Sequence, residues 1–197
     1  MRKSDTRARI IASASVLLRR HGYHATGLAQ IIAHSGAPRG SVYFLFPGGK
    51  EQLAVAAVNG WTEEFERRIR ALHAAHGTAR AWVEAMADEF AGELRASGYT
   101  EGLPITIITL DSVPASAALT EACRSAYDTW LAALTEGLVA HGAAAGHAER
   151  LAKLMLASLE GAAVLCRAYQ STAPLEQIVP FVLEQLPAGA GEPRYTG

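Results

Sequence analysis

The sequence predicts an all-α protein, with an N-terminal helix-turn-helix domain followed by a larger helical domain. Apolar residues recur at intervals of three and four along most of the chain, which is the spacing of one helix face. Helix breakers interrupt this pattern at Gly22, Gly36, Gly77 and Pro114. The sequence has no sustained alternation of apolar and polar residues, which is the pattern of a half-buried strand.

Residues 1–50 contain the elements of a helix-turn-helix. Thr26 is expected to cap the second helix, Gly36 to form the turn, and Pro38 to occupy the first position of the third helix, where a missing N–H does no harm. The expected helices cover about residues 5–21, 28–35 and 38–45, and a long fourth helix covers about 50–75.

The remainder of the chain is also expected to be helical. The β-branched run ITIITL (105–110) is the one candidate strand, but it has no partner strand, and a buried helix is favoured there. Further helices are expected near residues 78–97, 103–111, 115–142, 147–171 and 174–186. The predicted organisation is a helix-turn-helix domain over 1–50, a larger helical domain over 51–189, and a disordered tail over 190–197.

Charge is distributed unevenly, although the formal net charge is −1. Residues 1–60 carry eight Lys and Arg against Asp5 and Glu51, a charge of +6, so residues 61–197 carry −7. A basic N-terminal part beside an acidic body indicates a polyanionic partner at the N-terminus, with a solvated basic face as the alternative.

The sequence offers no segment for membrane insertion or secretion. No apolar run approaches the roughly 18 residues of a membrane helix, and the N-terminus lacks the apolar stretch of a signal peptide. Cys123 and Cys166 match no metal-ligand spacing and are expected to be reduced thiols. A cytoplasmic protein without a membrane partner, a metal or a cofactor is therefore expected.

Several motifs resemble a known family of regulators. The first helix ends in HGYHAT, the turn and third helix read SGAPRGSVYFLF, and Lys50 begins the next helix. Residues 5–50 thus resemble the DNA-binding domain of TetR-family transcriptional repressors. FPGGKEQLA, EGLPITIITLD, EACRSAYDTW and LEGAAVLCRA are similar to the LmrA/YxaF subgroup of that family. Ile32 and Leu45 depart from the family pattern, which commonly has alanine at the first position and often histidine or tyrosine at the second.

The third helix has the features of a helix that reads the major groove of double-stranded DNA. Val42 and Phe46, four residues apart, are expected to anchor it to the domain. Arg39 is expected to contact a guanine edge, with a phosphate contact as an equal alternative. Thr26 and Lys50 lie at helix starts that suit a phosphate. The alternatives are that Thr26 only caps its helix and that Lys50 is simply solvated. The predicted DNA-binding residues are Thr26, Arg39, Gly40, Ser41, Tyr43, Phe44 and Lys50.

The remaining helices are expected to form a homodimer that binds a palindromic operator. As the resemblance implies, they are also expected to form a pocket for a small hydrophobic or aromatic effector, whose binding releases the protein from the operator. For each residue predicted for the pocket or the dimer, the alternative is an ordinary place in the hydrophobic core. The predicted pocket residues are Trp82, Met86, Phe90, Ile105, Thr109, Tyr127, Trp130, Cys166 and Tyr169. The predicted dimer residues are Leu151, Leu154, Met155, Ser158, Leu159, Ala162, Ile178, Val179, Val182 and Leu183.

Other classes of function have weaker support in the sequence. It contains no glycine-rich phosphate loop, nucleophile elbow or HExxH motif, so an enzyme is not expected. The histidine pairs 21/24 and 73/76 have a spacing that can bind metal, but they lie at expected helix ends, where solvated histidines are commoner. A regulator that senses redox state through its thiols and a helical dimer that binds another protein remain as alternatives.

Overall fold

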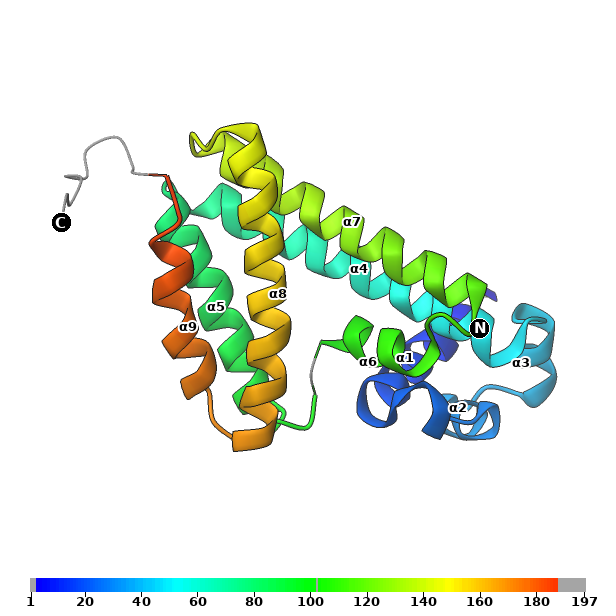
Figure 1. Cartoon of the computed structure of the whole chain (residues 1–197). Coiled ribbons are helices and arrows are strands. Elements are labelled where there is room, and N and C mark those ends of the chain that lie inside the picture. The colour runs from blue at the N-terminus through cyan, green and yellow to red at the C-terminus, as the bar shows by residue number, and fades with distance from the viewer. Residues whose placement is uncertain (1–2, 102, 188–197) are drawn as a thin grey trace. The chain divides into compact units, whose positions relative to one another are not determined.

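In the computed structural model, which describes residues 3–101 and 103–187, the regular structure of that part of the chain consists of nine helices (Figure 1). The run ITIITL is helical, as favoured above, and the expected tail 190–197 lies outside the described residues. None of the described helices is both long and apolar enough to cross a membrane. The helices are α1 (Lys3–Ala25), α2 (Leu28–Ser35), α3 (Arg39–Leu45), α4 (Gly49–Ala75), α5 (Ala79–Ala96), α6 (Pro104–Ser112), α7 (Ala117–Ala140), α8 (Ala145–Tyr169) and α9 (Ala173–Leu183).

The chain forms two compact units. Unit 1 comprises residues 1–63 and 101–127, and unit 2 comprises residues 64–100 and 128–197. The long helices α4 and α7 each contribute residues to both units. Unit 1 therefore contains the expected DNA-binding domain, residues 1–50, together with α6 and parts of α4 and α7.

The core of unit 1 joins the helix-turn-helix to α6. Helix α1 lies against both α2 and α6. Val42 and Phe46 are buried, which confirms the expected anchor of α3. Ile10, Ala14 and Leu18 of α1 are fully buried, as their helical spacing predicts, together with Ile31, Leu53, Ile105, Ile108 and Leu119.

Three local features of unit 1 differ from the expectation. Gly22 does not end the first helix outright: its backbone (φ 77°, ψ 179°) breaks the helical path, and helical residues follow as far as Ala25. The cap of α2 is Gly27, whose N–H donates to the side-chain oxygen of Gln30. The expected Thr26 cap is therefore wrong. Pro38 is the residue before α3 rather than its first residue.

Unit 2 packs its helices around two tryptophans. Trp82 of α5 is fully buried, and its indole N–H donates to the carbonyl oxygen of Ile69 over 3.2 Å. Trp130 of α7 is buried against the ring of Phe65, at 4.7 Å between ring centroids. Helix α9 lies against both α5 and α8, and the three stand side by side in Figure 1.

Candidate DNA-binding surface and effector pocket

The outer face of α3 presents aromatic and cationic side chains to solvent. Tyr43 is 48% exposed and Phe44 is 70% exposed, while Val42, which precedes them, is fully buried. Arg39 and Gly40 are also exposed, and Ser41 is half-buried. The sequence prediction for these five residues is thus compatible with their accessibility, and DNA contact itself stays a prediction.

Arg39 and Tyr43 form one surface feature because they lie one helical turn apart. The guanidinium carbon of Arg39 lies 5.6 Å from the centroid of the Tyr43 ring, and its Nη2 donates to the Tyr43 hydroxyl over 3.4 Å. Such stacking orders a long side chain on an exposed helix without using most of its donors. A Cβ added at Gly40 beside this pair would meet no protein atom within 4 Å, so the backbone there is open to a close approach.

Thr26 is placed differently from the expectation. Its side chain is fully buried, and its hydroxyl donates to the carbonyl oxygens of Gly22 over 2.7 Å and Leu17 over 3.2 Å. A hydroxyl committed to the end of α1 and shielded from solvent has no access to a phosphate. We therefore leave Thr26 out of the DNA-contact set.

Lys50 has a partner within the domain. Its Nζ donates to the carbonyl oxygen of Tyr23 over 2.9 Å and lies 4.1 Å from the centroid of the Tyr23 ring. Burial, with a smaller contribution from Glu51, raises the pKa of the Tyr23 hydroxyl. Lys50 is half-buried, so it ties the start of α4 to the end of α1 while its ammonium keeps some exposure.

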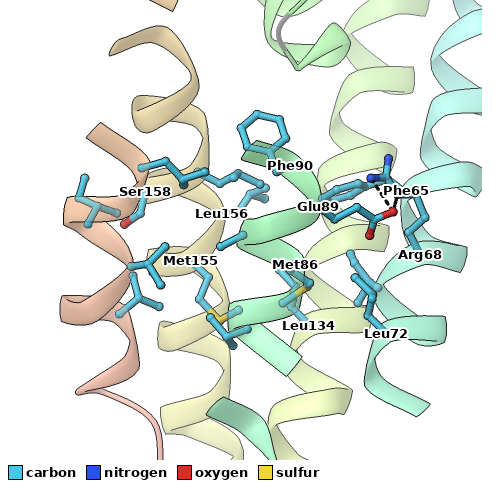
Figure 2. Close-up of a pocket in the computed structure, with 18 residues that line it drawn as sticks. Phe65, Arg68, Leu72, Met86, Glu89, Phe90, Leu134, Met155, Leu156 and Ser158 are labelled. Atoms are coloured by element: carbon cyan, nitrogen blue, oxygen red, sulfur yellow. Dashed lines mark hydrogen bonds and ion pairs between the residues drawn. The ribbon is translucent and has the colours of Figure 1, made fainter. Parts of the chain in front are cut away.

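Unit 2 contains a cavity of about 80 Å³ between α4, α5, α7, α8 and α9. Of the residues predicted for a pocket, Met86 and Phe90 line it (Figure 2). Its walls are almost entirely apolar, and the two methionines among them, Met86 and Met155, are side chains that adapt readily to a ligand. The other apolar lining residues are Phe65, Ile69, Leu72, Val83, Ala87, Leu134, Leu156, Leu159, Leu175, Ile178, Val179 and Val182.

One ion-pair cluster borders this apolar cavity (Figure 2). Arg68 Nη2 lies 3.0 Å from Glu89 Oε1, and its Nη1 lies 2.6 Å from Glu93 Oε1. Arg68 and Glu89 line the cavity, with Ser158 as the only uncharged polar lining residue. The sequence prediction missed Arg68 and Glu89 because they lie 21 residues apart on different helices, and no local motif links them.

Comparisons with known proteins agree with this geometry. Residues 10–57 match the N-terminal domain of bacterial regulatory proteins of the tetR family, and residues 79–180 match the C-terminal domain of LmrA/YxaF-like transcriptional regulators. The HTH-type transcriptional regulator LmrA of Bacillus subtilis is 34% identical over 178 residues, which cover 90% of this chain and 95% of LmrA. The chain belongs to the TetR family of transcriptional regulators.

Solved structures show the same fold as this regulator. A TetR-family transcriptional regulator of Agrobacterium tumefaciens superposes with a TM-score of 0.82 at 21% identity, covering 95% of this chain and 100% of the other. A TetR transcriptional regulator of Chloroflexus aurantiacus gives a TM-score of 0.75 at 28% identity, covering 92% and 94%. The relatives and structural neighbours are transcriptional regulators rather than enzymes.

The other seven residues predicted for the pocket of the regulator lie elsewhere. Trp82, Trp130 and Cys166 are buried core residues of unit 2 that do not line the cavity. Tyr169 is 72% exposed and borders a separate surface hollow. Ile105, Thr109 and Tyr127 belong to unit 1, so the apolar concentration read from the sequence combined two cores.

The predicted dimer seam also needs correction, because most of its residues face into unit 2. Met155, Ser158, Leu159, Ile178, Val179 and Val182 line the cavity, and Leu151, Ala162 and Leu183 are buried. Leu154, which is 45% exposed, lies on the outer face, and Ile178 also borders the surface hollow lined by Tyr169. The exposed apolar side chains of the same helices are instead Leu154, Val164, Leu165, Tyr169 and Phe181.

The two thiols show no sign of activation. Burial raises the pKa of the Cys123 thiol, and the neighbouring Thr109 hydroxyl offsets only part of that rise. A thiol with a raised pKa is a poor nucleophile and a slow target for oxidants. Cys166 is fully buried in unit 2, so neither cysteine gives specific support to a redox-sensing regulator.

A pair of histidines packs on Trp82. The ring centroids of His73 and His141 lie 4.7 Å apart, and His73 meets the indole edge-on at 5.1 Å. Among the described residues, no group of three or more His, Cys, Asp or Glu side chains is arranged to hold a metal ion. The pair is therefore treated as part of the packing around Trp82.

This packing predicts a loss of stability in mild acid. Burial, and then the charge of His73, lower the pKa of His141 from its ordinary 6.5. Between the lowered value and 6.5 the unfolded chain binds more protons than the folded one, so the free energy of unfolding falls as pH drops below about 6.5. Urea unfolding at about pH 7.5 and about pH 5.5 should show a smaller loss for His141→Gln than for the unaltered protein. Equal losses would contradict the assignment.

Proposed function

We propose that this TetR-family regulator binds a palindromic operator as a homodimer and represses transcription until a small hydrophobic or aromatic effector releases it. The observation that carries the proposal is the exposed face of α3, where Arg39, Tyr43 and Phe44 stand out from a buried anchor. A short helix with donors and aromatic groups on its outer face suits the major groove. Binding to DNA would place the protein in the cytoplasm.

A homodimer is needed because a seven-residue reading helix buries too little surface for specific binding on its own. The outer face of α8 and α9 supports such a dimer. It carries Tyr169 at 72% and Phe181 at 67% exposure, which border a hollow with Leu165. A contiguous exposed apolar surface of this kind favours self-association, and a two-fold axis would bring the same face of a second copy against it.

The cavity of unit 2 supports control by an effector. Its apolar walls suit a hydrophobic or aromatic body, and the Arg68–Glu89 pair offers charged groups at its border. Release requires only that the effector binds better to a conformation in which the two α3 helices no longer match the half-sites. About 5.5 kcal/mol of difference in binding would shift the populations from 99:1 to 1:99.

The DNA-binding part is tested by two substitutions on α3. A duplex selected by the protein from a random pool should be palindromic, with half-sites about 34–36 Å apart or a multiple of that distance. Tyr43→Ala should weaken binding to the selected duplex and to random DNA by similar factors, because a phosphate contact is independent of sequence. Arg39→Ala should weaken the selected duplex more, by about 1–3 kcal/mol, because a bidentate contact to guanine is lost.

Titrations by fluorescence anisotropy at several salt concentrations separate the roles. Tyr43→Phe is the matched control for the ring: it keeps the aromatic ring under Arg39 and removes only the hydroxyl, so it separates the contribution of the hydroxyl from that of the ring. If Arg39→Ala lowers both affinities equally and reduces the salt slope by about one, Arg39 holds phosphate and does not discriminate bases. If the protein selects no duplex at all, the dimer that binds another protein becomes the better proposal.

The effector part is tested by filling the cavity. Ala87 lines it, so Ala87→Phe should weaken binding of the neutral fluorescent probe N-phenylnaphthylamine by about tenfold or more while leaving DNA affinity within about twofold. Ala96→Phe is the control, because Ala96 is exposed at the end of the same helix. Unchanged probe binding in Ala87→Phe would place the effector site elsewhere.

A further inference from the structure

The chain between α1 and α2 is held in an unusual path. We call residues 22–26 the kink segment, because Gly22 (φ 77°, ψ 179°) breaks the helix there and Thr26 leads into α2. Within it, the buried Thr26 hydroxyl donates to the carbonyl oxygen of Gly22 over 2.7 Å. The direction in which α2 and α3 leave the domain therefore depends on how these five residues are fixed.

Asp111 of α6 holds the kink segment at two points. The backbone N–H of Tyr23 donates to Asp111 Oδ2 over 2.7 Å. His24 Nε2 lies 2.6 Å from the carbonyl oxygen of Asp111, to which a protonated nitrogen donates. A hydrogen bond from a backbone N–H to a carboxylate is charge-assisted and about twice as strong as a neutral one. Asp111 is thus bonded through both its side chain and its backbone.

Lys50 of α4 binds the other backbone group of Tyr23. Its Nζ donates to the carbonyl oxygen of Tyr23 over 2.9 Å. The N–H and the C=O of Tyr23 are therefore bonded by side chains of opposite charge from α6 and α4, respectively. This arrangement leaves the kink segment little freedom to rotate.

Asp111 can lie this close to the kink segment because residue 22 is glycine and has no side chain. A Cβ at residue 22 would lie 2.6 Å from Asp111 Oδ2 and 3.2 Å from Cγ2 of Ile107, both on α6. Its positive φ also disfavours any side chain. Ile107 does not take part in the hydrogen bonds, so its close approach adds a packing contact between α6 and the kink segment.

We propose that Asp111 is a positioning residue for DNA recognition: from α6, outside the helix-turn-helix, it fixes the kink segment and through it the orientation of α2 and α3. The inference rests on the proposed DNA-binding function.

The charge of Asp111 makes the test sensitive. Removing a carboxylate from a DNA-binding unit should by itself strengthen binding, because it removes repulsion of the phosphates. A positioning role predicts the opposite. Glu101→Gln is the matched control: Glu101 also binds α1, through Arg19 and Arg20 at 3.5 Å each, and both arginines precede the kink segment.

The experiment measures affinity for the selected duplex and the NMR signal of the Tyr23 amide in the full-length protein. Asp111→Ala should lower affinity about tenfold or more and move the Tyr23 amide proton upfield with faster exchange. Asp111→Asn, which keeps a carbonyl acceptor, should restore part of both, and Glu101→Gln should bind as well as the unaltered protein or better.

The outcomes separate the two proposals. If the unaltered protein selects a duplex and Asp111→Ala binds it equally well, the positioning role is overturned and the DNA-binding function stands. If the unaltered protein binds no duplex, both are overturned. Should Asp111→Ala be too unstable to compare, Asp111→Asn decides alone: a perturbed Tyr23 amide with undiminished affinity would reject the positioning role.

Discussion

Phe181→Asp is expected to convert the regulator from a dimer into monomers and to lower its affinity for the selected duplex by about 100-fold or more. Phe181 is 67% exposed on α9 and borders the same hollow as Leu165 and Tyr169 of α8. A carboxylate there would be buried without a partner in the dimer, which costs several kcal/mol for each copy. Once separated, the two α3 helices would bind their half-sites independently.

The mass measured by light scattering after size-exclusion chromatography, together with duplex titrations, checks this result. Val139→Asp is the matched control, because Val139 is also an exposed apolar side chain of unit 2 but lies on α7. It should leave both the mass and the affinity unchanged. A Phe181→Asp variant that stays dimeric would reject the α8–α9 face as the interface.

The assignment of that face shows where sequence periodicity reaches its limit. Helix α8 carries two apolar stripes, one with Leu151 and Met155 and another with Leu154, Leu165 and Tyr169. Both have helical spacing, so the pattern alone does not tell which stripe faces the core. The sequence prediction assigned Leu151, Leu154 and Met155 together to the dimer, whereas in the structure Leu151 is buried, Met155 lines the cavity and Leu154 is exposed.

The existence and order of the helices were predictable, because apolar residues recur with helical spacing and breakers such as Gly36 and Pro114 separate one such run from the next. The exception at the end of α1 has a long-range cause. Gly22 was predicted as a stop from its local pattern, but its conformation also admits Asp111, a residue 88 positions after Tyr23. Thr26 follows the capping rule in sequence, yet its hydroxyl is bonded to α1 and Gly27 is the cap.

The cavity was only partly predictable for a related reason. Aromatic and apolar side chains line pockets and fill cores equally well, so Trp82 and Trp130 were expected in the pocket although they are packed solid. Met86 and Phe90 line the cavity, and their role in binding an effector stays a prediction. Arg68 and Glu89 meet only through the packing of α4 on α5, which residue spacing along the chain does not specify.

The packing of Trp82 leads to the second large prediction. In a helix, replacing glycine by alanine normally stabilises the fold by about 1 kcal/mol, because the glycine backbone loses more entropy on folding. At Gly137 of α7 the sign should reverse. A Cβ there would lie 2.8 Å from Cζ3 and 3.0 Å from Cζ2 of Trp82, whose ring is fully buried and held by the bond to Ile69.

Gly137→Ala should therefore lower the free energy of unfolding by about 1–3 kcal/mol, since the indole has no space into which it can move without disturbing His73 and His141. Gly92→Ala in α5 is the control, because a Cβ at Gly92 meets no atom within 4 Å, and it should stabilise the fold by up to about 1 kcal/mol. Urea unfolding followed by circular dichroism measures both changes. A gain in stability for Gly137→Ala would mean that the indole yields readily, and that the core of unit 2 is looser than the contacts of Trp82 imply.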